Sequence, residues 1–447
     1  MNFEPPNPAQ PAQSHGSLLV LAVLALLVGT AAGALGALFR LALEHADQWR
    51  NDLIGWAHNE GLAGFLLVLV TCTTAPLLAA WLVRRVSPYA SGSGIPHVEA
   101  VLREEIPHAP FHLIWVKFFG GLLAIGSGMA LGREGPSVQM GASVAFLVGR
   151  VFRRNWPDCR VLFAAGAGAG LATAFNAPIA GAVFVLEELV RRFEPHIAIA
   201  AVGASATAIA VARLFIGDAA DFYVDALAYP RAEAKPLFFL LAAAAGLVAI
   251  VYNRAILGGI ALAERVPGLP AEWRAALIGT MVGTLAWFAP GLVGGGDPIT
   301  QRCLIGAEML SMLPLLFLLR FGLGTLSYAA ATPGGLFAPM LVLGAQLGVF
   351  FGLVCRLAFP SLDIQPEGFA VVGMAAFFTG VVRAPLTGMV LVTEMTASVT
   401  MLLPMLGACF VAMLVPTLLR DVPIYDALRE HTTRRERAAQ PKGPVGG

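Results

Sequence analysis

The chain is poor in charge. Asp, Glu, Lys and Arg make up 13% of its 447 residues, and 57% of the residues are hydrophobic. Soluble globular domains carry about 25% charged residues. The net charge is only +1, and no basic stripe marks a surface for nucleic acid. This deficit of charge, together with repeated apolar runs, predicts an all-α polytopic protein of the lipid bilayer with no nucleic-acid partner.

Paired cysteines and metal-ligand motifs are missing as well. The five cysteines are scattered, odd in number and without a CxxC spacing: Cys72, Cys159, Cys303, Cys355 and Cys409. They indicate neither a disulfide framework nor a metal site. The eight histidines form no ligand-spaced pair in an apolar run, and no HExxH occurs. An intramembrane hydrolase is therefore disfavoured, because it needs a nucleophile with a base or a set of metal ligands.

The two ends of the chain are polar. Residues 1–16 are proline-rich and lack the basic region of a cleaved signal peptide. We expect them to be a disordered lead into a first span over about 18–43. Residues 429–447 are polar and basic, and the positive-inside rule predicts that they form a cytoplasmic tail. Too little chain follows the last apolar run to expect a further regulatory domain.

Glycine and proline interrupt the apolar runs, with 49 and 30 copies. Runs such as 138–152 and 384–394 are too short to cross a hydrocarbon core of about 30 Å. The pattern predicts many tilted, broken and re-entrant helices. Broken helices at membrane depth are tolerated only where they are buried or line a polar cavity.

The two halves of the chain repeat each other. The segment FNAPIAGAVFVLEE (175–188) matches VRAPLTGMVLVTEM (382–395), and a second pair of blocks places Gly132 and Pro136 in register with Gly335 and Pro339. A polar loop at 215–236 separates repeat 1 (about 17–215) from repeat 2 (about 236–428), which together form a membrane domain over 17–428. Such duplication is typical of transporters, whose sites lie where the broken helices of the repeats meet.

Three segments share the pattern G-x-x-x-P before an apolar helical run: GSGIP (92–96), GREGP (132–136) and GLFAP (335–339). Proline is favoured at the first helical position, and glycine lets the preceding backbone turn tightly. Each segment therefore predicts a helix N-terminus with free N–H groups and a partial positive charge. Three such ends together would make a weak anion site from which the anion can also leave.

Charged residues inside the apolar runs are candidates for function. A bare carboxylate at membrane depth is expensive, which makes Glu134 a candidate by default. Glu187 recurs in the second half as Glu394, which favours a structural role, whereas Glu188 has Met395 as its counterpart. Arg133 either tunes the local potential or anchors a loop. Two further charges, Lys117 and Arg383, either raise anion affinity or are paired structurally.

The segments GSGIP, GREGP, GGLFAP and PIYDAL occur in the order found in the CLC chloride channels and transporters, and the chain resembles that family over about 20–428. The resemblance implies a CLC-type fold of two inverted repeats with many tilted helices. It also implies a homodimer with one pore per subunit, and a multi-pass protein of the cell (inner) membrane. The short length is similar to that of prokaryotic members.

The resemblance assigns roles to named residues. Ser93 and Tyr425 correspond to hydroxyl donors at a central chloride, and the N–H groups of Leu336 and Phe337 line the same site. Glu134 corresponds to the external gate and proton carrier, and Glu188 to the internal proton-transfer group. The supporting backbone around the anion site is assigned to Gly92, Gly94, Arg133 and Gly135.

The predicted function is exchange of chloride for protons, without a metal or an organic cofactor. A passive chloride channel is the nearest alternative, since it shares every anion-site residue and differs only in proton coupling. Glu188 favours the exchanger, because channels of the family commonly have an apolar residue there. A fluoride/proton antiporter is less favoured, because the fluoride branch departs from the motif residues that Ser93 and Pro136 retain.

Overall fold

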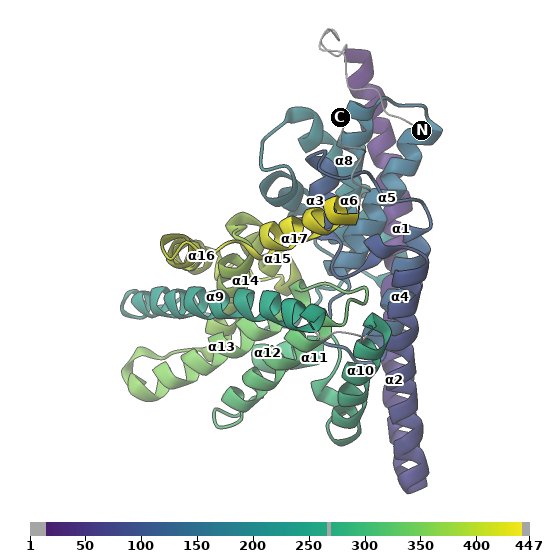
Figure 1. The fold of residues 1–447 in the computed structure, drawn as a ribbon. Coiled ribbons are helices and arrows are strands. Elements are labelled where there is room, and N and C mark those ends of the chain that lie inside the picture. Colours follow the sequence, from purple (N-terminus) through teal and green to yellow (C-terminus); the bar gives the residue numbers. More distant parts are fainter. Residues whose placement is uncertain (1–14, 266–269, 440–447) are drawn as a thin grey trace, which may run out of the picture.

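The computed structural model describes residues 15–265 and 270–439, and this part of the chain is helical, with two isolated β-bridges in place of a sheet. Figure 1 shows the helices of the first half gathered on one side and those of the second half on the other. Two helices of the second half pack against the first half: α10 packs against α2, and α17 packs against α3. The polar loop between α8 and α9 joins the halves.

The first half contains α1 (His15–Ala57), α2 (Gly61–Arg85), α3 (Ile95–Leu102), α4 (Leu113–Gly126), α5 (Glu134–Val151), α6 (Trp156–Phe175), α7 (Pro178–Phe184), the π-helical turn η3 (Val185–Leu189) and α8 (Pro195–Ile216). The second half contains α9 (Lys235–Arg265), α10 (Ala271–Phe288), α11 (Asp297–Leu304), α12 (Leu313–Ala329), α13 (Phe337–Ala358), α14 (Pro366–Val382), α15 (Pro385–Thr396), α16 (Leu402–Leu418) and α17 (Ile424–Ala439). Short 3-10 turns, η1 (His58–Glu60), η2 (Pro88–Ala90), η4 (Ala232–Ala234), η5 (Pro290–Leu292) and η6 (Pro360–Leu362), join some of them.

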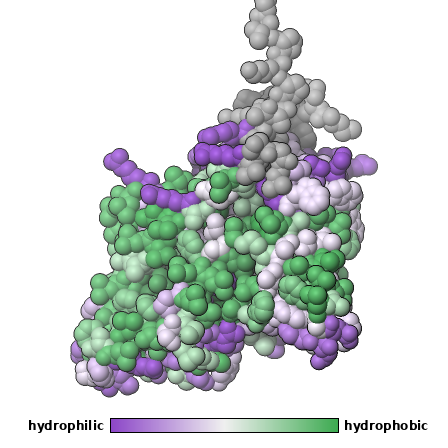
Figure 2. Space-filling view, turned by 60° about the horizontal axis from the view of Figure 1, so that its bottom comes forward, coloured by the Kyte–Doolittle hydropathy of each residue, from purple (hydrophilic) through white to green (hydrophobic). Residues whose placement is uncertain are grey.

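The outside of the molecule carries an apolar belt. Within the described residues, four helical stretches have the length and composition to cross a membrane: Leu18–Arg85, Pro195–Ile216, Ala232–Arg265 and Phe337–Ala358. Figure 2 shows hydrophobic residues across the middle of the surface and hydrophilic residues along two opposite edges. A belt of this kind faces lipid, and its polar edges face water.

Helices extend past both predicted boundaries of the membrane domain. Helix α1 begins at His15 and continues past the predicted span to Ala57, so residues 15 and 16 belong to a helix, while 1–14 lie outside the described residues. Ion pairs such as Arg40 with Glu44, at 3.0 Å, support the polar extension of α1. At the other end, α17 crosses the predicted boundary at 428/429 because Arg429 pairs with Asp426 and Glu105. Residues 440–447 lie outside the description.

The prolines of the three motifs stand slightly deeper in their helices than predicted. Pro96 is the second residue of α3, and Pro136 and Pro339 are the third residues of α5 and α13. The first N–H groups of a helix have no intrahelical partner, so proline anywhere in the first turn removes no backbone bond. The prediction of the first position is wrong, but its consequence, an open helix N-terminus, holds.

Reciprocal contacts relate the two repeats in space. Gly132 and Gly335 occupy equivalent positions, and each donates its N–H to the carbonyl of the other, at 2.9 and 2.7 Å. The carboxylate of Glu394 accepts the N–H groups of Ile179 and Ala180 at the start of α7. The carboxylate of Glu187 accepts those at the start of α15. Exchange of the same contact in both directions is the signature of a two-fold relation between the repeats.

Close helix packing follows the same symmetry. A Cβ at Gly344 of α13 would lie 2.6 Å from the carbonyl oxygen of Gly373 in α14, and a Cβ at the equivalent Gly141 of α5 would collide with the carbonyl of Gly166 in α6. Only glycine permits this approach of backbones. The two helix pairs hold the starts of α5 and α13 at the centre of the molecule.

Candidate functional site

The site begins with Glu134, the first residue of α5. Its side chain is fully buried, and its Oε1 accepts the N–H of Phe337, the first residue of α13, at 2.7 Å. A Cβ on either Gly132 or Gly335 would collide with this carboxylate, which explains the glycine at both positions. Oε2 has no hydrogen-bond partner among the described residues. The positive end of α13 thus holds a buried negative group on backbone donors alone.

The loop before α3 brings Ser93 to the same place. Gly92 and Gly94, on either side of it, adopt φ values of 61° and 87°, a region that favours glycine. A Cβ at Gly135 would lie 2.6 Å from Ser93 Oγ, so the hydroxyl rests directly on the start of α5. Ser93 is 1% exposed, and within the described part of the chain its Oγ has no partner. A buried hydroxyl in this state can donate to a ligand.

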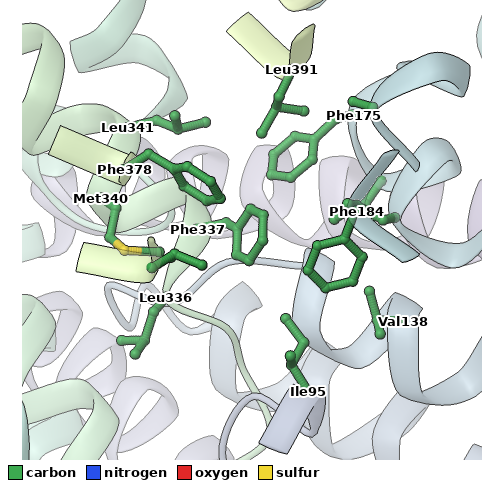
Figure 3. Packing of buried hydrophobic residues seen from close by; sticks show 14 of the residues in the cluster. Ile95, Val138, Phe175, Phe184, Leu336, Phe337, Met340, Leu341, Phe378 and Leu391 are labelled. Carbon is green, nitrogen blue, oxygen red and sulfur yellow. The ribbon is translucent and has the colours of Figure 1, made fainter. Parts of the chain in front are cut away.

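Tyr425 reaches the site from the start of α17. It is fully buried, its ring centroid lies 6.0 Å from that of Phe337, and its hydroxyl has no partner in the described residues. Phe337 itself lies among apolar side chains of both halves, including Phe184 and Phe378 (Figure 3). Leu336, which caps α13, is also buried. The side chains of Leu336 and Phe337 therefore pack, and their backbone is what faces the site.

A buried cation binds the glycine-containing loop before α3, and another binds the equivalent loop before α11. Lys117 donates from Nζ to the carbonyl of Gly92 at 2.7 Å. Arg320, at the equivalent position of the second repeat, donates to the carbonyls of Gly294 and Gly295 at 2.9 and 3.0 Å. Among the described residues Lys117 makes no ion pair, so its charge stays beside the loop that carries Ser93. This settles how Lys117 is held, which the sequence left open.

Two other arginines of the sequence analysis are engaged structurally. Arg133 turns away from its neighbour Glu134: its Nε donates to the carbonyl of Ala174 at 2.8 Å, and its terminal nitrogens lie 3.3 and 3.4 Å from Asp221 and Asp297. It therefore anchors the loop between the halves to the start of α11. Arg383 lies 3.3 Å from a carboxylate oxygen of Asp421.

Glu188 belongs to a buried cluster of charges. It lies in the π-helical turn η3, is 2% exposed and accepts from Arg191 at 3.2 Å. Arg191 also pairs with Asp426 at 2.8 Å and lies 3.6 Å from Glu99, which is fully buried in the middle of α3. The sequence analysis missed Glu99 and Asp426. An acid in the apolar run directly after GSGIP is the signal that could have found Glu99.

Two separate cavities approach the site from the side of α17. One, of about 420 Å³, is bordered by Ser93 and His97 and by His431 of α17. The other, of about 640 Å³, is bordered by Glu188, Arg191 and Pro423, the residue before α17. Helix α3 separates them, since Ser93 and His97 face the first cavity and Glu99 joins the cluster of Glu188.

These features define a multi-pass membrane transport protein. It has an apolar belt, open helix starts buried at its centre, and two cavities that lead towards those helix starts. A family profile described as voltage gated chloride channel matches residues 75–417. The chain belongs to this family, and the predicted resemblance and all-helical fold are confirmed.

Relatives and solved structures agree with this assignment. The H(+)/Cl(-) exchange transporter ClcA of Vibrio parahaemolyticus serotype O3:K6 is 37% identical over 411 residues, 90% of this chain and 87% of the relative. The ClcA of Yersinia pestis bv. Antiqua (strain Angola) is 38% identical over 382 residues, 84% and 80% of the two chains. The crystal structure of a slow cyanobacterial Cl-/H+ antiporter matches with a TM-score of 0.89 and 32% identity, covering 93% of this chain and 99% of that one. A CLC-type fluoride/proton antiporter shares the fold, with a TM-score of 0.79 and 21% identity.

Proposed function

We propose that this protein exchanges chloride for protons across the cell (inner) membrane, as a homodimer in the lipid bilayer and without a metal or organic cofactor. The two ClcA relatives and the cyanobacterial antiporter carry this activity in their names. The basic segment from 429 supports a cytoplasmic position for the C-terminus and α17 by the positive-inside rule. The two cavities beside α17 then open towards the cytoplasm.

One observation carries the proposal: the carboxylate of Glu134 rests on the N–H of Phe337, at the start of α13. The ionised carboxylate occupies backbone donors that would otherwise hold an anion. Protonation removes its charge and its competition, and chloride takes its place. Glu134 is then both the gate and the outer proton carrier, and each proton that it accepts makes room for an anion.

The chloride ligands are the groups that surround this position. Ser93 and Tyr425 contribute buried hydroxyls that have no partner among the described residues. Leu336 and Phe337 contribute backbone N–H groups at the start of α13. The anion faces partial charges and not a countercharge, so it binds weakly enough to leave. Supporting the site, Gly92 and Gly94 shape the loop of Ser93, Gly135 gives its hydroxyl room, and Arg133 fixes the start of α5 from outside.

The inner ends of the two routes lie on different faces of α3. Chloride uses the cavity that reaches Ser93. Protons use the cavity that reaches Glu188, where the neighbouring acids and arginines can redistribute charge as Glu188 gains or loses a proton.

The test uses purified protein in liposomes with an imposed chloride gradient and the membrane voltage clamped near the proton equilibrium potential. We expect proton movement against its own gradient, driven by chloride and followed as external pH. Chloride flux without uphill proton movement would make the protein a passive channel. Proton movement driven by fluoride but not by chloride would make it a fluoride antiporter.

A further inference from the structure

His97 is a buried histidine that the chloride route, as described above, leaves unused. It is the third residue of α3, immediately after the GSGIP segment, and is 5% exposed. Both ring nitrogens are buried, and neither has a hydrogen-bond partner among the described residues. Buried polar atoms nearly always have a partner, so the ring nitrogens require water or a ligand.

The ring borders the cavity of about 420 Å³ that also reaches Ser93. The cavity is large enough to hold an ion with several waters, since each water occupies about 30 Å³. His97 packs against Tyr89, with ring centroids 5.0 Å apart. One side of the imidazole is therefore covered by Tyr89, and the side chain, which is 5% exposed, forms part of the cavity wall.

The surroundings favour an anion over a cation. The buried ammonium of Lys117 binds the carbonyl of Gly92 at the inner end of the cavity. Arg274 also borders the cavity, as does Arg84, whose charge is paired with Glu272 at 2.6 Å. The acid on its wall, Glu264, pairs with His431 at 3.2 Å. A cation would meet this positive wall without a dedicated acidic ligand, whereas an anion is stabilised by it.

The geometry of α3 keeps His97 apart from the proposed proton route through Glu188. His97 and Glu99 are two residues apart on the helix, which turns them about 200° away from each other. His97 faces the cavity of Ser93, and Glu99 faces Arg191 and Glu188. A change at His97 therefore acts on the anion route and leaves the charge cluster in place.

We propose that His97 is a direct ligand of the transported anion on the inner part of the chloride route, donating a ring N–H to a halide that waits between Ser93 and the mouth of the cavity. A neutral imidazole carries the one N–H donor that this contact needs. The inference rests on the proposed chloride transport and adds a residue to it.

The test compares three variants by calorimetric titration of chloride into protein in a chloride-free detergent buffer. His97→Leu removes the donor and should weaken chloride binding by about tenfold or more, since hydrogen bonds to charged groups are among the strong ones. His97→Gln keeps an N–H donor and should stay within about twofold of wild type. His58→Leu is the matched control, because His58 stacks on Trp287 and does not border the cavity; its chloride affinity should not change.

Wild-type chloride affinity in His97→Leu would overturn the inference, as would crystals grown in bromide that show no anomalous peak beside the ring. The bromide experiment uses the wild-type chain and remains decisive if His97→Leu fails to fold. The proton-to-chloride ratio of His97→Leu should equal that of wild type, and a changed ratio would assign the residue to the proton route. Failure of the wild type to bind or move chloride at all would instead refute the proposed function.

Discussion

Glu134 and Phe337 occupy equivalent positions in the two repeats, and the N–H of the second donates to the carboxylate of the first at 2.7 Å. Each is the first residue of its helix, α5 or α13. One repeat therefore supplies the negative group and the other supplies the donors that hold it. This division of labour breaks the symmetry of the fold at its centre, where the duplicated glycines and prolines otherwise match.

Neutral substitution of Glu134 should separate the two fluxes. In Glu134→Gln or Glu134→Ala the N–H of Phe337 loses its charged partner, so the anion site stays open at every pH. We expect chloride flux to persist, uphill proton movement to fall to background, and the pH dependence of chloride flux to disappear. The measurement is paired chloride and proton flux in liposomes across a range of pH. Retained proton pumping in either variant would remove Glu134 from the role of gate.

Glu188 and Glu187 are adjacent and should respond in opposite ways. Glu188→Gln removes a charge from the cluster of Arg191, Glu99 and Asp426 but keeps a side chain of the same size. We expect chloride flux to continue while proton coupling falls by at least about tenfold, the loss expected when a required proton donor is removed. Paired flux measurements test this, and unchanged coupling would return Glu188 to a structural role.

Glu187→Gln is the matched control for that experiment. The Glu187 carboxylate accepts the N–H groups of Leu386 and Thr387 and the Thr387 hydroxyl at the start of α15. Loss of a helix cap costs about 1 kcal/mol. The melting temperature in detergent should therefore be lower for Glu187→Gln than for wild type, while the proton-to-chloride ratio stays at the wild-type value. A normal melting temperature would contradict the capping role.

Lys117 and Arg320 bind equivalent loops, and the loop of Lys117 carries Ser93, which we propose as an anion ligand. Lys117→Met should weaken chloride binding about tenfold, because the carbonyl of Gly92 loses its donor and the site loses a buried charge. Arg320→Met should lower thermal stability and leave chloride affinity within about twofold, since its loop leads to Asp297. Calorimetric chloride titration of both variants makes the comparison. Equal losses of affinity would show that the two loops act on the site together.

Much of this architecture could be predicted from the sequence, because the information is local or repeated. Helix starts follow from glycine and proline spacing, and the depth of Glu134 follows from the apolar runs around it. The recurrence of Glu187 as Glu394 correctly indicated a structural role, and the reciprocal caps show what that role is. The predicted helix positions of the prolines were wrong by one or two residues, because proline is tolerated throughout the first turn of a helix.

The parts that escaped prediction depend on distant packing. Nothing in the local sequence places Glu99 beside Arg191, since residues about ninety positions apart meet only when α3 packs against η3. The extension of α1 beyond its apolar run includes Arg50, which pairs with Asp47 and donates to the carbonyl of Gly126, the last residue of α4, at 3.1 Å. The two cavities likewise arise from spaces between helices of both halves.

The reciprocal caps have a consequence for how the chain is assembled. The start of α7 is completed by a carboxylate near the end of α15, and the start of α15 by one just after α7. Each half therefore supplies the cap of a helix in the other half. When the first half has been synthesised, the N–H groups at the start of α7 still lack their acceptor in the second half. The start of α7 therefore stays without its cap until α15 has been made and packed against it.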